Sequence, residues 1–252
     1  MKASLVAISL VSTVLTGCVT VDAQDRPRAM TTMDAAMAAI ANPLRPAADR
    51  ARDVARKPME TVVFAGVRPG DTVAELAPGG GWYTRILAGT VGPTGRIYAL
   101  VSPQQAARPG GLDAINALAA QYGNITVVPT DYTAIAIPTP ADVVWTTENW
   151  HDFHNGPTAN PTGIAKAAYA ALKPGGLLFI EDHSAPGTGT SATQTLHRID
   201  AAAVIAEATA AGFKLDAQSS HMANTADDHT AAVRDAGVQG HTDKFALRFK
   251  KR

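Results

Sequence analysis

Residues Thr72–Thr84 read TVAELAPGGGWYT, and this stretch decides the fold. Alternating apolar residues end at Leu76, which is typical of a short buried strand. Pro78 and the glycines Gly79–Gly81 then predict a sharp turn, after which Trp82–Gly89 resumes at helical spacing. A strand, a glycine turn and a helix lay the backbone against a ligand at the helix N-terminus. Glycine is required there because a Cβ would block both a positive φ and close approach of the ligand.

The composition is that of a globular protein without a charge bias. The chain has 252 residues, of which 46% are hydrophobic, enough for one large domain with its own core. Lys plus Arg and Asp plus Glu both number 22, so no net field favours nucleic acid or an acidic membrane surface. Aromatic residues make up only 6%, which argues against a stacking groove for single strands. We therefore expect no nucleic-acid partner.

The N-terminus has the pattern of an export signal. A short positive start and an apolar run over residues 3–15 precede Cys18, the only cysteine, and the run is too short to span a bilayer. The pattern resembles a bacterial lipoprotein signal, which implies removal of residues 1–17 and a lipid on Cys18 as the sole membrane contact. An ordinary signal peptide with an incidental cysteine is the alternative. Residues 18–30 are then expected to form a polar tether. The resemblance to bacterial lipoproteins implies a location at the outer membrane, facing the periplasm, because the residue after the cysteine is Val19 and not Asp.

Strand and helix patterns alternate along the rest of the chain, which we interpret as a single domain over residues 31–252. Its N-terminal helical extension covers 31–68 and its α/β core 69–252. The expected helices of the extension are 32–41, 46–57 and one opened by Pro58. The expected strands are 72–77, 95–101, 125–128, 141–146, 177–181, 213–219 and 243–250, with helices over 82–89, 111–122, 161–172 and 199–211. This alternation predicts an α/β fold with a doubly wound, mostly parallel seven-stranded sheet covered on both faces.

The predicted helix over residues 46–57 carries acid–base pairs three and four residues apart. Such pairs are typical of a solvated helix face. The alternative is that Asp49, Arg50 or Arg56 turns inward over the glycine turn, because these helices immediately precede it.

Glu75, Ala77, Gly79 and Gly81 fall as E-x-A-x-G-x-G. This spacing resembles motif I of the class I S-adenosylmethionine (SAM)-dependent methyltransferases more than the dinucleotide fingerprint, and the lack of Gly-Lys-Ser/Thr excludes a P-loop. The order of the predicted elements resembles the Rossmann-like fold of that superfamily, and LKPGG over 172–176 resembles its turn before the fifth strand. The features RARD, ELAPGGGWYTRILA and HDFHN resemble a group of predicted bacterial methyltransferases that carry a lipoprotein signal.

The resemblance implies SAM as the cofactor. Glu75 would place a negative charge near the amino group of SAM, and Asp131 would accept a hydrogen bond from the adenine amino group. Where the family has an acidic residue for the ribose, at the end of the second strand, this chain has Ser102, which offers one hydrogen bond. The expected cofactor-binding residues are Glu75, Ala77, Pro78, Gly79, Gly80, Gly81, Tyr83, Ser102, Asp131, Tyr132 and Asn149.

Two histidine-containing stretches, 148–155 and 181–183, follow the fourth and fifth predicted strands. His151-Asp152-Phe153 resembles the HDW segment of small-molecule O-methyltransferases, which implies that the histidine is the general base. Methyl transfer to a hydroxyl requires removal of its proton, and imidazole titrates near the operating pH. Asp152 or Asp182 could orient the ring. The expected catalytic residues are His151, Asp152 and His154, with a structural role as the alternative for His154.

Two hypotheses of function follow. The first is a SAM-dependent methyltransferase that acts on a small molecule at oxygen and holds no metal. The second is an exported protein of this fold that does not use SAM, as a periplasmic binding module or a metal-assisted enzyme. The metal ligands would then be His151, Asp152, His154, Asp182 and His183, although their spacing is no recognised zinc pattern. The intact set of Glu75, the glycines and Asp131 favours the first hypothesis; the export signal and the missing ribose acid favour the second.

Overall fold

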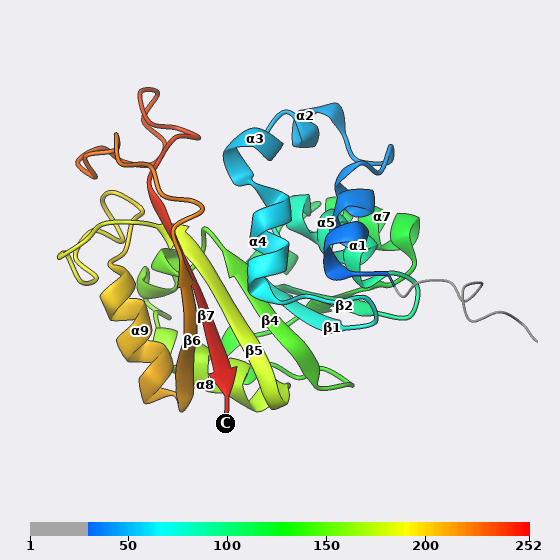
Figure 1. Cartoon of the computed structure of the whole chain (residues 1–252). Helices are drawn as coiled ribbons and strands as arrows, with labels where there is room; N and C mark the ends of the chain where they lie inside the picture. The colour runs from blue at the N-terminus through cyan, green and yellow to red at the C-terminus, as the bar shows by residue number, and fades with distance from the viewer. Residues whose placement is uncertain (1–29) are drawn as a thin grey trace, which may run out of the picture.

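The computed structural model describes residues 30–252, and its strands and helices follow the predicted alternation (Figure 1). The predicted leader over residues 1–17, the lipid attachment site Cys18 and all but the last residue of the predicted tether lie outside the described residues. None of the helices in the described part is both long enough and apolar enough to cross a membrane.

A seven-stranded sheet in the order β3-β2-β1-β4-β5-β7-β6 forms the centre of the fold. Its strands are β1 (Thr72–Leu76), β2 (Arg96–Val101), β3 (Ile125–Pro129), β4 (Ala141–Thr147), β5 (Leu172–His183), β6 (Phe213–Ser219) and β7 (Lys244–Lys251). Strands β1 to β5 pair in parallel, and β7 runs antiparallel to both of its neighbours. The predicted doubly wound, mostly parallel sheet is confirmed.

Helices cover both faces of the sheet and enclose two hydrophobic cores (Figure 1). One face carries α1 (Thr32–Ile40), α4 (Pro58–Ala65), α5 (Trp82–Val91) and α7 (Asp113–Tyr122), and the other carries α8 (Pro161–Ala171) and α9 (Ala201–Ala210). Along β1, Val73 belongs to the first core, whereas Ala74 and Leu76 belong to the second. Successive side chains of a strand point to opposite faces, so a strand buried on both faces is apolar at nearly every position.

The prediction of one helix over residues 46–57 was wrong, because the chain forms two short helices, α2 (Ala47–Arg50) and α3 (Asp53–Arg56). Arg45, only 1% exposed, donates to Asp53 Oδ1 and Oδ2 at 2.6 and 2.9 Å, and to the carbonyl of Ile40 at 2.8 Å. This bidentate pair between the buried guanidinium of Arg45 and the partly exposed carboxylate of Asp53 holds Asp53 against the N-terminal part. It outweighs the solvated acid–base pairs of a continuous helix, each worth only about 0.2–0.5 kcal/mol.

Strand β5 begins five residues earlier than predicted because the LKPGG turn is a bulge inside it. Ala141 pairs with Leu172 and Val143 with Leu177, so residues 173–176 loop out between the two pairs. Gly175 has φ 76°, a left-handed conformation that favours glycine.

A short helix that the sequence did not predict, α6 (Pro103–Ala106), follows β2. The side chain of Ser102 caps it by accepting a hydrogen bond from the backbone N–H of Gln105 at 3.2 Å. The cap thus occupies the hydroxyl oxygen of a residue that we expected to bind the cofactor.

The loops at the carboxyl ends of the parallel strands gather at one end of the molecule. In Figure 1 this is the upper end, where α2 and α3 lie on one side and the segments 184–200 and 220–243 on the other. Doubly wound sheets bind their ligands at this end. The fold therefore brings both predicted histidine-containing stretches to the expected end of the sheet.

Candidate functional site

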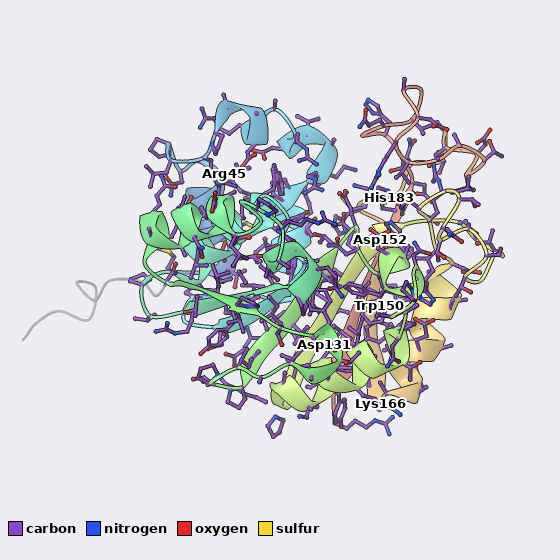
Figure 2. All side chains as sticks on the ribbon, turned by 180° about the vertical axis from the view of Figure 1, so that it is seen from behind. Arg45, Asp131, Trp150, Asp152, Lys166 and His183 are labelled. Carbon is purple, nitrogen blue, oxygen red and sulfur yellow. The ribbon has the colours of Figure 1, made fainter. Side chains whose placement is uncertain are left out.

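A cavity of about 650 Å³ lies at this end of the sheet. Residues 51–56 form one wall, residues 233–244 form the opposite wall, and the loops after β4 and β5 form the floor together with His197. Figure 2 labels two of the floor residues, Asp152 and His183, which lie beside each other beneath the loops. Two smaller cavities share lining residues with it: one of about 310 Å³ through Asp152, and one of about 230 Å³ through Arg52, Arg56 and Glu148.

His151 is held at the cavity floor by Asp182. Its Nδ1 atom lies 2.7 Å from Asp182 Oδ1, and its backbone N–H donates to Asp182 Oδ2 at 2.7 Å. Burial lowers the pKa of His151, but the fully buried carboxylate of Asp182 outweighs burial and leaves that pKa above its usual value. Of the two orienting carboxylates that the sequence left open, Asp182 therefore holds Nδ1, and Nε2 remains for a ligand.

Asp152 and two further histidines surround the His151 ring. Asp152 Oδ1 lies 3.4 Å from His151 Nε2 and 3.2 Å from His197 Nδ1. His183 also lines the cavity, with Nδ1 2.8 Å from Thr242 Oγ1, and burial lowers its pKa to about 4. His183 is therefore neutral at physiological pH.

His154, the third predicted catalytic residue, lies against α9 and is not among the residues that line the large cavity. Its Nε2 atom is 3.2 Å from Glu207 Oε1, and the indole N–H of the buried Trp150 donates to Glu207 Oε2 at 2.8 Å. These contacts tie the short 3₁₀ turn His151–His154 to α9. His154 thus lies outside the large cavity, and both its catalytic role and the structural alternative stay predictions.

Glu148 ties three segments together at the boundary between the cavities. Its Oε1 accepts a hydrogen bond from Lys244 Nζ of β7 at 2.5 Å, and its Oε2 pairs with the guanidinium of Arg56 of α3. Burial would raise the pKa of Glu148, but the charges of Lys244 and Arg56 hold it well below its usual value. Next to this cluster, Glu181 Oε1 lies 3.7 Å from Lys244 Nζ, and burial raises the pKa of Glu181 to about 7.

The structure divides the predicted cofactor-binding residues between the two smaller cavities. The cavity of about 230 Å³ is lined by Glu75, Ala77, Pro78, Gly79, Gly80, Tyr83 and Asn149, and that of about 310 Å³ by Ser102, Asp131 and Tyr132. Gly81 lines neither, since a Cβ there would lie 2.5 Å from Leu118 Cδ2 of α7. The left-handed φ of 81° and this close packing favour glycine at position 81, whose contact with a cofactor stays a prediction.

Glu75 and the glycine turn form an open cradle. Glu75 is 3% exposed, its Oε2 has no hydrogen-bond partner, and burial raises its pKa to about 7. A Cβ added at Gly79 or Gly80 would meet nothing within 4 Å, so this backbone is bare toward the cavity. Ala77, at φ 51°, holds a left-handed conformation that costs a non-glycine residue energy. The buried carboxyl group of Glu75, next to backbone that no side chain covers, suits a ligand that carries a cationic group.

The second small cavity presents polar groups that are already partly engaged. Asp131 Oδ1 accepts hydrogen bonds from the backbone N–H and hydroxyl of Thr133, both at 2.8 Å. The hydroxyl of Tyr132 donates to the carbonyl of Leu100 at 3.2 Å, and burial raises its pKa to about 12. The residues that line this cavity include Asp131 and Asp152 but no acidic residue from the end of β2.

Residues 233–244, which form one wall of the large cavity, were not predicted to belong to the site; only residues 243–250 had been assigned, to the last strand. Lys244 and Thr242 contact Glu148 and His183, which precede them by more than 50 residues. His197, to which the sequence analysis assigned no role at the site, also lines the cavity. No local sequence pattern identifies these residues as part of the site. The only signal for them was the number of histidines in the segments that follow the strands.

The comparisons with known proteins concern the fold. No family model matches the sequence, and no curated protein matches it. The structure is similar to a SAM-dependent methyltransferase from Aquifex aeolicus, with a TM-score of 0.56 and 15% identity over 80% of this chain and 98% of that one. It is also similar to the [4+2]-cyclase SpnF, with a TM-score of 0.57 and 18% identity over 81% of this chain and 82% of that one.

A third similar structure is the mitomycin 7-O-methyltransferase MmcR, with a TM-score of 0.53 and 15% identity over 80% of this chain and 53% of that one. At these identities the likeness confirms the class I methyltransferase fold that the sequence predicted. Because a cyclase shares this fold, the reaction has to be argued from the site itself.

Replacing Glu148 by Gln should destabilise the protein, because it leaves Arg56 and Lys244 without their shared carboxylate. We expect the free energy of unfolding to fall by about 2 kcal/mol, less than for a fully buried pair because the Glu148 side chain is 21% exposed. The measurement is urea unfolding followed by circular dichroism.

The matched control is Asp216→Asn, which breaks the exposed pair between Asp216 and Arg248. Its effect should stay within about 1 kcal/mol, as for surface pairs in general. Equal effects of the two substitutions would contradict a structural role for Glu148 at the site.

Proposed function

We propose that the chain is a SAM-dependent methyltransferase that transfers a methyl group to an oxygen of a small molecule, with His151 as the general base. One observation carries the proposal. The cavity lined by Glu75 and by the bare backbone of Gly79 and Gly80 adjoins a second cavity, with His151 oriented at its floor. A cofactor in the smaller cavity and a base in the larger one would thus lie on either side of the residues that line both cavities, Arg52, Arg56 and Glu148.

The residues of the small cavities fit SAM. The Glu75 carboxylate would accept the amino group of its methionyl portion, and Asp131 would accept the adenine amino group. The Ser102 hydroxyl caps α6 through its oxygen and would reach a ribose oxygen through its proton. When bound, SAM supplies an electrophilic methyl group, so the protein has to position the acceptor and remove its proton.

The larger cavity fits a small-molecule acceptor. Its volume of about 650 Å³ lies within the usual range for such ligands, about 300–1,000 Å³. An acceptor hydroxyl at the floor would donate its proton to His151 Nε2, because Asp182 occupies Nδ1 at 2.7 Å. The buried Asp182 carboxylate would stabilise the imidazolium that forms.

Calorimetric titration with SAM, and with S-adenosylhomocysteine, tests the cofactor. We expect micromolar binding that is lost in Asp131→Ala. The raised pKa of about 7 leaves Glu75 largely protonated below pH 7, whereas the ammonium of SAM favours its carboxylate. Binding should therefore release a proton, and affinity should rise from pH 5.5 to 7, by at most about tenfold per pH unit. The SAM amino group stays protonated over this range.

Glu75→Gln is the matched control for the pH dependence, because it keeps the shape of the side chain and cannot ionise. It should bind SAM more weakly and with an affinity that does not change with pH. Absence of binding at millimolar SAM would reject the proposal. The alternative would then hold, namely a protein of this fold that acts without SAM as a binding module or a metal-assisted enzyme. Lipid attachment at Cys18 and a periplasm-facing location at the outer membrane stay predictions from the sequence.

His151→Ala should reduce turnover by roughly a hundredfold or more, as for loss of a general base. Turnover is measured as release of S-adenosylhomocysteine with an acceptor found by screening hydroxylated small molecules. The loss should be smaller for acceptors whose hydroxyl is already ionised at the assay pH, because they need no base. His154→Ala, which alters a contact with Glu207, is the comparison and should keep its rate. An unchanged rate in His151→Ala would remove His151 from this role.

A further inference from the structure

We propose that His151, Asp152 and His197 form a binding site for one divalent transition-metal ion at the floor of the 650 Å³ cavity. Each residue offers one donor atom, and these atoms all lie within 4.8 Å of one another. Asp152 Oδ1 is 3.4 Å from His151 Nε2 and 3.2 Å from His197 Nδ1. Bonds of about 2.0–2.1 Å in a tetrahedral site put neighbouring donor atoms about 3.3 Å apart, so both separations suit a shared ion.

Asp182 prepares His151 for this role. It lies 2.7 Å from Nδ1 and accepts the backbone N–H of the same residue, so the ring is fixed with Nε2 toward Asp152. A carboxylate behind a ligating histidine is the usual arrangement that orients the ring and raises its basicity at metal sites. Asp182 is fully buried and would contact the ion only through His151.

The backbone next to His197 is anchored equally firmly. Arg198 is fully buried and donates to both carboxylate oxygens of Asp227 at 2.7 and 3.2 Å, and to the carbonyls of Ser184 and Ala231 at 3.2 and 3.0 Å. His197 itself has φ 54°, a left-handed conformation that a non-glycine residue keeps only where its surroundings impose it. Such strained backbone is typical of functional sites. Here the left-handed conformation positions the His197 ring next to Asp152.

The donor set selects the class of ion. Two imidazoles and one carboxylate suit Zn²⁺, Co²⁺ or a related first-row ion, whereas Mg²⁺ and Ca²⁺ prefer oxygen ligands. The set differs from the one that the sequence suggested, since His154 contacts Glu207 and His183 contacts Thr242. A metal would use the same Nε2 lone pair of His151 as general-base catalysis, so the two states exclude each other. The metal site consists of His151, Asp152 and His197 alone, so its formation does not require SAM.

Calorimetric titration of the SAM-free protein with Zn²⁺ tests the site. We expect one ion per chain. His197→Asn removes a ligand while Asn tolerates the left-handed backbone, and it should weaken binding at least about tenfold. Asp182→Asn removes no ligand and should still weaken binding by about tenfold to hundredfold, a loss that an adventitious histidine site would not show.

His229→Asn is the matched control, because His229 also has a left-handed backbone, with φ 64°. Its ring pairs with the carboxylate of Asp243 at 3.0 Å and lies outside the three-residue set. The affinity of this variant for Zn²⁺ should equal that of the wild type. Co²⁺ gives a second readout, a visible absorption that is present in the wild type and lost in His197→Asn, with circular dichroism to verify folding. Absence of Zn²⁺ binding up to millimolar concentration, or equal affinity of the wild type and His197→Asn, would overturn the proposal.

Discussion

The ion pairs of Glu148 are the constraint on which the site depends. Glu148 directly follows β4 and has a left-handed backbone. Its carboxylate binds Lys244 of β7 and Arg56 of α3. These partners belong to the two walls of the large cavity, so the wall from the N-terminal helices and the wall from the C-terminal loop are both fixed to the centre of the sheet. Since Arg56 and Glu148 also line the smaller cavity, the same contacts set the boundary across which a cofactor and an acceptor would meet.

Strained backbone marks the same end of the sheet. Ala77 after β1, Glu148 after β4 and His197 in the loop before α9 all have positive φ without being glycine. Each makes a specific contact: Asn149 donates to the carbonyl of Ala77 at 3.3 Å, Glu148 pairs with Arg56 and Lys244, and His197 Nδ1 lies 3.2 Å from Asp152 Oδ1. The structure tolerates local strain where it fixes side chains around the cavities, as expected for a preorganised site.

The fold could be predicted from sequence because its signals are local. Apolar alternation predicts β1, and the glycine turn before Trp82 predicts the loop between β1 and α5. The break between α2 and α3 could not be predicted, because it depends on an ion pair between Arg45 and Asp53 that outweighs helical spacing. The same limit applies to the site. The segment around His151 was found from its own pattern, whereas its partner Asp182 could only be offered as one of two carboxylates. The wall that includes Lys244 was missed, because long-range packing brings it to the site.

In the proposed function, SAM extends across the two smaller cavities and the larger cavity holds its acceptor. The most direct measurement is a crystal structure of the protein grown with S-adenosylhomocysteine. In this structure the amino group of the ligand should lie at Glu75 and its adenine at Asp131. Its sulfur should face the cavity that contains His151. A ligand bound elsewhere, or crystals in which Glu75 and Asp131 contact only water at saturating ligand, would contradict it.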